Sequence, residues 1–207
     1  MTHFLGAGTI ASDIVRKETR NGVVATFRLR SGVKGRGQVW IDVEAWGHLA
    51  GTVHRHGKSD RPVIVAGRLA QKTWHARATG EARHRYVITA NDIDLLPDDH
   101  EVELANTVVA FGTVDGSPAA RPAGTGSVTE FRLTTGRAGS KTGRLWIDVE
   151  HWHQAPVLLN RRTRVGLAGH LAFGPNGADH RRYYVDAADM TALPAHAEVA
   201  VPDHRLA

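Results

Sequence analysis

The chain of 207 residues contains no cysteine. Disulfide bonds and thiolate chemistry are therefore excluded, which fits a reducing cytosol. No stretch approaches the roughly 18 consecutive apolar residues of a membrane span. The first residues carry no basic leader followed by a long apolar run, so we expect no signal peptide and no membrane partner. Aromatic residues make up only 6% of the chain, and five of them are tryptophans.

Enzyme motifs are also missing. We find no nucleophile elbow, no nucleotide-binding glycine motif and no paired catalytic acids in a suitable context. Of the 13 histidines, the two clusters are His54-Arg55-His56 and His151-Trp152-His153. Neither recurs in the other half of the chain, and neither has the spacing of a zinc site. We therefore expect solvated histidines, no metal, no cofactor and no enzymatic activity.

The charge indicates an anionic partner. Apolar content of 42% and charged content of 23% are ordinary for a globular protein, but the net charge is +5 and the isoelectric point is near 10. Residues 1–98 carry 15 Lys and Arg against 9 Asp and Glu, and residues 106–194 carry 10 against 7. Residues 99–105 carry three acidic residues and no basic one. The basic excess therefore lies in the two halves and not in the segment between them.

One stretch occurs twice. Residues 40–46 read Trp-Ile-Asp-Val-Glu-Ala-Trp, and residues 146–152 read Trp-Ile-Asp-Val-Glu-His-Trp. A Phe-Arg-Leu run precedes each copy, at residues 27–29 and 131–133. The offset between matching segments ranges from 97 to 106 and changes only inside predicted loops, where insertions are tolerated. This pattern predicts a tandem duplication.

The repeated stretch alternates as a β-strand does. Side chains two residues apart share a face, so Ile41, Val43 and Ala45 lie together. Asp42 and Glu44 share the other face with the two tryptophans, and carboxylates are almost never buried without partners. The aliphatic face is therefore predicted to be the core, and the tryptophans are predicted to lie on the open face. The alternative is that this face packs on a loop, another barrel or another protein.

The order of elements predicts an all-β protein of two tandem OB-folds, each a five-stranded Greek-key barrel with one short helix. In the first unit we expect strands at 1–11, 23–30, 40–46, 62–71 and 86–90, with the helix at 47–57. A polar connection at 12–22 and a basic glycine-rich hairpin tip at 31–38 separate the first three strands. The predicted domains are residues 1–98, an acidic linker at 99–105, a second unit at 106–194 and a short tail at 195–207.

The open faces carry groups suited to single-stranded nucleic acid. A binder without sequence preference needs aromatic planes for bases and cations for phosphates, and stacking is worth about 1–3 kcal/mol per base. Carboxylates on the same face oppose this unless neighbouring arginines pair with them. The predicted binding residues are Trp40, Trp46, Trp74, Trp146, Trp152, Arg28, Arg30, Arg68, Lys72 and Arg132.

These motifs resemble the bacterial single-stranded-DNA-binding protein family, abbreviated SSB. The resemblance rests on Thr26-Phe27-Arg28-Leu29, on Trp40 through Trp46-Gly47-His48-Leu49-Ala50, and on Gly67-Arg68-Leu69 with Trp74 seven residues after the glycine. It covers nearly all of residues 1–97. The resemblance implies that Trp40, Trp46 and Trp74 stack on bases.

The second unit keeps only part of this pattern. Trp146 and Trp152 match, but Asn176 stands at the Trp74 position and His170 replaces Arg68. The two-copy arrangement is similar to SSB proteins with two OB-folds, which form homodimers that present four. Family members usually end in an acidic tail with an apolar tip, whereas residues 195–207 are nearly neutral. Recruitment of repair enzymes through such a tail is therefore not expected.

The sequence thus predicts sequence-nonspecific binding and protection of single-stranded DNA in replication, recombination or repair, at the bacterial nucleoid in the cytoplasm. The alternative is an OB-fold protein-interaction or replication-restart module with weak nucleic-acid binding. Binding to nucleic acid should weaken steeply with salt, whereas protein docking through apolar tryptophans should not.

Overall fold

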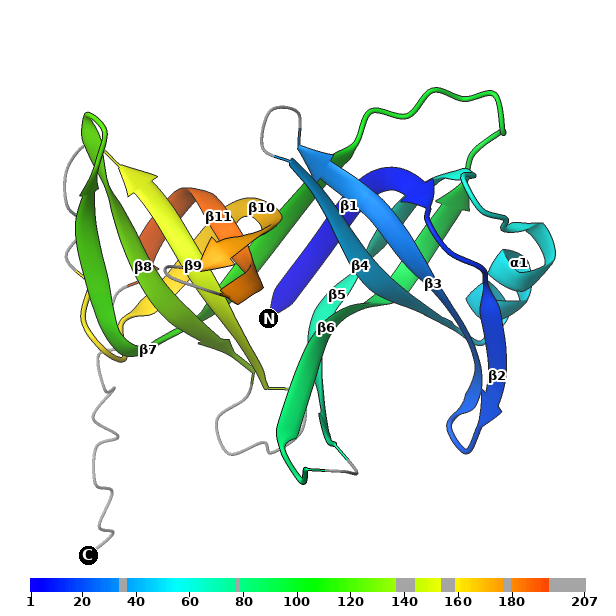
Figure 1. Ribbon diagram of the computed structural model, residues 1–207, viewed down its shortest axis with the longest axis horizontal. Helices are drawn as coiled ribbons and strands as arrows, with labels where there is room; N and C mark the ends of the chain where they lie inside the picture. The colour runs from blue at the N-terminus through cyan, green and yellow to red at the C-terminus, as the bar shows by residue number, and fades with distance from the viewer. Residues whose placement is uncertain (34–36, 77–78, 137–143, 154–158, 177–179, 194–207) are drawn as a thin grey trace, which may run out of the picture.

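A computed structural model shows two β-barrels that lie side by side (Figure 1). It describes residues 1–33, 37–76, 79–136, 144–153, 159–176 and 180–193. Within this part of the chain the structure has eleven strands and a single helix of nine residues. That helix is not long enough to cross a membrane.

The first barrel consists of β1 (Thr2–Ile10), β2 (Val15–Thr19), β3 (Gly22–Val33), β4 (Gly37–Trp46), β5 (Pro62–His75) and β6 (Ala82–Leu95). Its core follows the predicted alternation, because Ile41, Val43 and Ala45 are at most 1% exposed. The helix α1 (His48–His56) joins β4 to β5 and buries Leu49, Ala50 and Val53 against this core. The predicted helix at 47–57 is confirmed.

Closure of the first barrel comes from β1. This strand pairs antiparallel with β5 on one side and, through Thr9 and Ile10, with β3 on the other. The sheet then runs β5–β6–β4–β3, with β4 and β6 parallel. Gly8 permits the contact at which β1 crosses β3, because a Cβ there would lie 1.9 Å from the Arg30 carbonyl oxygen.

The second barrel repeats this topology with β7 (Ala105–Ala123), β8 (Gly126–Thr135), β9 (Leu145–His153), β10 (Arg164–Asn176) and β11 (His180–Leu193). β7 pairs with both β8 and β10, and β9 runs parallel to β11 as β4 does to β6. The prediction of an all-β chain of two tandem OB-folds is confirmed.

Three details differ from the prediction. The connection at 12–22 contains β2, an exposed strand that pairs with β3 at the edge of the sheet. β7 already begins at Ala105, since this residue pairs with Ala7 of β1. The helix expected in the second unit falls at 153–163, where residues 159–163 form a turn and 154–158 lie outside the described residues. Residues 195–207, the predicted tail, also lie outside them.

β1 and β7 join the two barrels into one continuous sheet. They pair antiparallel from Thr2 opposite Ala110 to Ala7 opposite Ala105. The repeat offset at these strands is 104, so Phe4 lies opposite Val108, its own counterpart. Thr2 lies opposite Ala110, and their counterparts Asn106 and Gly6 likewise lie opposite each other. The contact is therefore isologous, as between two identical subunits related by a twofold axis.

Two tyrosines extend this pseudo-twofold contact. The Tyr86 hydroxyl donates to the backbone carbonyl of Trp146 at 2.6 Å, and the Tyr183 hydroxyl donates to that of Trp40. Tyr86 and Tyr183 match at an offset of 97, and Trp40 and Trp146 match at 106. The two tyrosine rings meet edge to face, with centroids 5.9 Å apart. Each barrel thus holds the backbone of the other barrel's tryptophan strand.

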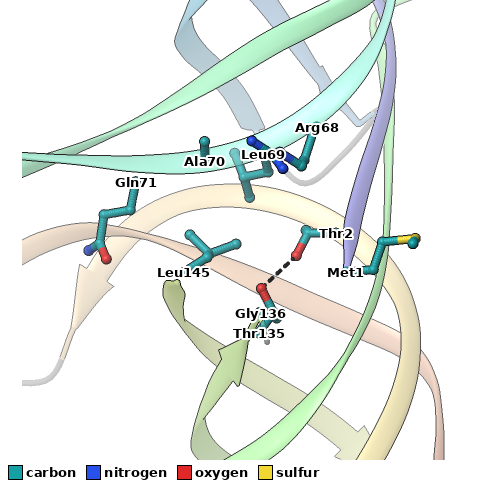
Figure 2. Close-up of a pocket in the computed structure, with 9 residues that line it drawn as sticks. All are labelled: Met1, Thr2, Arg68, Leu69, Ala70, Gln71, Thr135, Gly136 and Leu145. Carbon is teal, nitrogen blue, oxygen red and sulfur yellow. Dashed lines mark hydrogen bonds between the residues drawn. The ribbon is translucent and has the colours of Figure 1, made fainter. Parts of the chain in front are cut away.

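A cavity of about 280 Å³ lies on one side of the axis, between the start of β1, the middle of β5 and the end of β8 (Figure 2). Arg68 and Gln71 line it, and the hydroxyls of Thr2 and Thr135 share a hydrogen bond of 3.1 Å at its edge. The related position on the other side holds only about 10 Å³.

Asn106 and His170 fill that second position. The Asn106 side chain accepts from the Leu171 backbone N–H at 2.6 Å and donates to the Leu171 carbonyl at 3.2 Å. His170 Nδ1–H donates to the Asn106 carbonyl at 2.7 Å. Asn106 and His170 are the counterparts of Thr2 and Arg68, so the two sides of the interface have diverged.

Candidate nucleic-acid interface

The predicted tryptophans lie on the outer face of the barrels. Trp40 is 43% exposed, Trp74 is 44% exposed and Trp152 is 50% exposed. Trp46 and Trp146 are half-buried, and neither belongs to the hydrophobic core. All five indole rings are therefore at least partly accessible. Trp40 lies beside the second barrel, because the Tyr183 hydroxyl donates to its backbone carbonyl.

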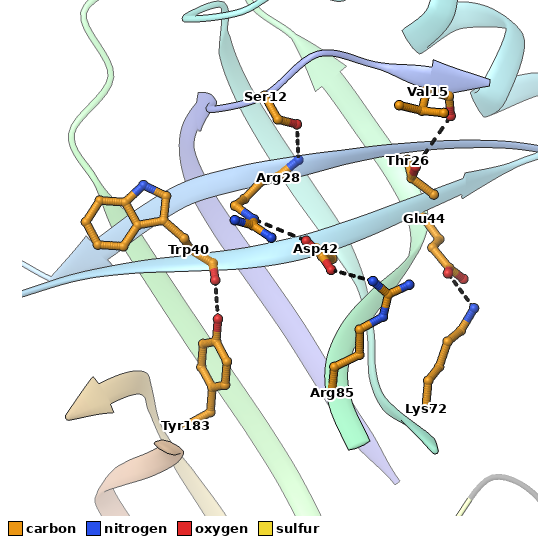
Figure 3. Close-up of polar contacts among 10 residues, drawn as sticks. All are labelled: Ser12, Val15, Thr26, Arg28, Trp40, Asp42, Glu44, Lys72, Arg85 and Tyr183. Atoms are coloured by element: carbon orange, nitrogen blue, oxygen red, sulfur yellow. Dashed lines mark hydrogen bonds and ion pairs between the residues drawn. The ribbon is translucent and has the colours of Figure 1, made fainter. Parts of the chain in front are cut away.

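The carboxylates between the tryptophans are paired with basic side chains (Figure 3). Arg28 Nε donates to Asp42 at 3.2 Å, and Arg85 Nη1 donates to its other oxygen at 3.0 Å. Lys72 Nζ donates to Glu44. Glu44 was expected on the open face, and its parity is the outward one, but it is only 5% exposed because Lys72 and its neighbours cover it. The pairing removes most of the repulsion that these carboxylates would exert on phosphate.

Two predicted binding residues of the first unit, Arg30 and Arg68, do not join this network. Arg30 faces Trp40 across the β3–β4 ladder, but its Nε donates to Thr9 Oγ1 at 3.1 Å rather than to a carboxylate. Arg68 is exposed and lies at the cavity between the barrels, beside Thr2 and away from the Asp42 network. The structure therefore brings Arg28, Lys72 and the two carboxylates together, and it places Arg68 elsewhere.

The second barrel repeats the central ion pair. Arg132 Nε donates to Asp148 at 3.1 Å, at the register position of the Arg28–Asp42 pair. Trp146 lies on the same strand, and the Arg144 guanidinium stands 5.6 Å from its ring centroid. Cations over an indole face are attracted by its quadrupole. An aromatic plane with an adjacent cation is therefore present in both barrels.

Three residues of the ion-pair network and of the contact between the barrels were not singled out from the sequence. Arg85 is not among the predicted binding residues, and the structure pairs it with Lys72 across the β5–β6 ladder, on the face of that cation. Tyr86 and Tyr183 match in the repeat, but nothing in the pattern placed them between the barrels. Burial and the nearby Asp42 carboxylate raise the pKa of the Tyr183 hydroxyl above its ordinary value, so the hydroxyl keeps the proton that it donates to Trp40.

The expectation of solvated histidines is wrong for His151. This residue replaces Ala45 on the core side and is 9% exposed, with Nδ1–H donating to the Ala187 carbonyl at 3.0 Å. Its neighbour His153 contacts Thr129 Oγ1 through Nε2 at 2.6 Å. A buried imidazole is tolerated here because a backbone carbonyl satisfies it. No group of residues in the described ranges has the composition of a metal site.

Comparison with known proteins identifies the family. Residues 1–96 match the single-strand binding protein family. Single-stranded DNA-binding protein 1 of Synechocystis sp. is 30% identical over 98 residues, which make up 45% of this chain and 80% of that protein. The chain belongs to the single-strand binding protein family. Single-stranded DNA-binding protein 1 of Chlorobaculum tepidum is also 30% identical over 98 residues, with 43% of this chain and 60% of that protein covered.

A third family member, single-stranded DNA-binding protein 2 of Nostoc sp., is 28% identical over 69 residues and is covered to 54% of its length. The chain thus spans a little over half of the Chlorobaculum and Nostoc proteins. Two crystal structures of the Thermus aquaticus single-stranded DNA binding protein extend the family fold over both barrels. A deletion mutant gives a TM-score of 0.72 at 18% identity, covering 94% of this chain and 95% of that one. The wild-type protein gives 0.71, also at 18% identity, with 98% of each chain covered.

Proposed function

We propose that this chain binds single-stranded DNA with little sequence preference and protects it during replication, recombination or repair at the bacterial nucleoid. Bases stack on the exposed tryptophans, and arginine and lysine side chains contact the phosphates. The proposal involves no catalytic step, metal or cofactor. It applies to a member of a family whose relatives are named for binding single-stranded DNA.

The observation that carries the proposal is the exposure of Trp40, Trp74 and Trp152. Large apolar side chains at 43%, 44% and 50% exposure are costly in water unless a partner covers them. None of the three belongs to the buried core, so the fold does not require an indole at these positions. Trp74 lies on a strand that also carries Arg68 and Lys72. The strands of Trp40 and Trp152 pair with β3 and β8, which carry arginine. A flat base and its phosphate fit this combination.

The first barrel is proposed as the stronger binding unit. Trp74 lies on the long β5–β6 hairpin, beside the Lys72 and Arg85 pair of that ladder. The second barrel has Asn176 in the matching position and His170 in place of Arg68. It therefore offers two tryptophans where the first barrel offers three. Joining the two units raises the overall affinity through effective concentration.

Fluorescence titration with oligo(dT) at low salt tests the proposal. We expect quenching of the tryptophan emission and a steep loss of affinity as salt rises. Trp40→Ala and Trp74→Ala should each weaken binding by about 1–3 kcal/mol without unfolding the protein. Trp152→Ala is the matched control, because it removes an exposed indole from the second barrel and should cost less. Absence of quenching in the wild-type protein would contradict the proposal.

We further propose a homodimer that presents four barrels. The outer face of β1 and β7 exposes Leu5 at 55% and Phe111 at 48%, next to half-buried Ile64 and Val109. This apolar face straddles the pseudo-twofold contact between the barrels, so a second copy can cover both halves at once. Phe111→Glu should therefore halve the mass measured by light scattering. A wild-type protein that is monomeric at micromolar concentration would disprove the dimer.

Docking to another protein is the alternative, and one observation favours it. Arg28, Arg85 and Lys72 are engaged with carboxylates, so fewer cations are free for phosphate than the net charge implies. Binding that persists at high salt, with little response to DNA, would support this alternative.

A further inference from the structure

A second open cleft lies between the barrels, with a volume of about 300 Å³. The β5–β6 hairpin of the first barrel forms one wall and contributes Gln71, Thr73 and His84. An amide and a hydroxyl both donate and accept hydrogen bonds, and a neutral imidazole does the same. This wall can therefore match the edge of any nucleobase.

Strands of the second barrel form the opposite wall. Trp146 supplies an aromatic plane, and its backbone carbonyl is held by the Tyr86 hydroxyl from the first wall at 2.6 Å. The Arg132–Asp148 ion pair and the exposed carboxylate of Asp115 complete this wall. The ring and the polar hairpin therefore face one space, and a hydrogen bond across the interface fixes their separation.

The charges of the cleft select one part of a nucleotide. Arg132 is paired with Asp148, Asp115 adds a negative charge, and the Arg144 guanidinium stands 5.6 Å from the Trp146 ring centroid. These charges balance, so a phosphate gains no net attraction there, whereas a base would find an indole to stack on and polar groups for its edge. We propose that this cleft is a base-binding subsite, in which a nucleobase is inserted as the strand crosses from the first barrel to the second. The inference rests on the single-stranded DNA binding proposed above.

The pseudo-twofold axis provides an internal comparison. Gln71 lies opposite Tyr86 in the β5–β6 ladder, and Phe173 lies opposite Tyr183 at the same position of the β10–β11 ladder. Phe173 packs on the Tyr183 ring with centroids 4.9 Å apart. A phenyl ring thus occupies the place that the smaller amide leaves open in the first barrel. The two sides of the axis therefore differ at this position of the hairpin.

Gln71→Phe tests the inference, because it introduces the Phe–Tyr pair that the second barrel already accommodates. Phe173→Gln is the matched control. We expect Gln71→Phe to weaken binding of an oligo(dT) of about 30 nucleotides, which spans both barrels, at least five-fold. Binding of an oligo(dT) of about 8 nucleotides, which one barrel can hold, should stay within two-fold. Phe173→Gln should not weaken either complex.

The slope of log affinity against log salt separates base from phosphate. Each lost phosphate contact lowers that slope by about 0.7 for a single strand, so an unchanged slope in Gln71→Phe supports insertion of a base. Trp146→Leu should weaken the long complex to a similar extent, and the double variant should lose less than the product of the two effects.

The opposite results are equally informative. Unchanged affinity for the long strand, equal loss for both lengths, a lower salt slope or an equal loss in Phe173→Gln would each overturn the subsite while leaving single-stranded DNA binding intact. A wild-type protein that binds no single-stranded DNA would overturn both proposals. Thermal unfolding of each variant confirms that the barrels are folded.

Discussion

The Lys72–Glu44 ion pair tests what stabilises the outer face of the first barrel. The Lys72 side chain is 44% exposed, but the Glu44 carboxylate that it binds is only 7% exposed. Removing one partner of a fully buried ion pair costs about 3–5 kcal/mol, whereas exposed pairs are worth about 0–1 kcal/mol. The half-exposed cation places Lys72→Met between these limits, at about 2 kcal/mol. For a chain of this size the loss lowers the Tm by roughly 4–8 °C.

The assay is urea unfolding followed by tryptophan fluorescence, together with the salt dependence of oligo(dT) binding. Lys72→Arg should keep most of the stability because it keeps a cation at Glu44. The double variant Glu44→Gln/Lys72→Met should recover part of the loss, since no buried charge remains. If Lys72→Met leaves the stability unchanged while the salt slope falls, Lys72 serves phosphate rather than Glu44, and the reasoning is wrong.

Three further predictions concern the barrels and their contact. Tyr86→Phe and Tyr183→Phe should each lower the free energy of unfolding by about 0.5–1.5 kcal/mol in urea titrations, because each deletes a hydrogen bond between the barrels. An unchanged free energy of unfolding in both variants would contradict this role. The raised pKa of Tyr183 adds stability that is complete below the unfolded-state value of about 10 and is lost as pH rises through the folded-state value. The Tm of the wild-type protein should therefore fall more steeply above pH 10 than that of Tyr183→Phe. Gly8→Ala should destabilise the first barrel by about 1–3 kcal/mol, since its Cβ would meet the Arg30 carbonyl; an unchanged urea midpoint would show that β1 shifts freely.

Alternation along the strands was the most reliable signal in the sequence. It placed Ile41, Val43 and Ala45 in the core because the carboxylates on the opposite parity could not be buried alone. The same rule failed for Glu44, which has the outward parity and is nevertheless buried. Parity fixes the face on which a side chain lies but not what covers it, and Lys72 is 28 residues away in the sequence. Prediction of that ion pair required the register between β4, β6 and β5.

The contact between the barrels could not be predicted in the same way. The repeat offsets showed which residues are equivalent, but equivalence does not show which ones touch. Phe4 faces Val108 only because the two copies pack edge to edge, and hydrophobic patterning within one barrel carries no information on that choice. The matching of Tyr86 with Tyr183 was visible in the sequence, and their hydroxyl bonds to the opposite barrel were not.

When two barrels are joined in one chain, the two sides of their interface can acquire different substitutions. In a homodimer every substitution appears on both sides of the twofold axis, so the two clefts are identical. In this chain the Phe4–Val108 pairing and the two tyrosine hydrogen bonds preserve the pseudo-twofold contact, while the surrounding side chains differ. Gln71 lines an open cleft, whereas Phe173 at the matching position packs on the Tyr183 ring. A DNA strand that crosses at the proposed Gln71 subsite would meet the two barrels in a fixed order, which would give the complex a direction that a symmetric pair of barrels does not have.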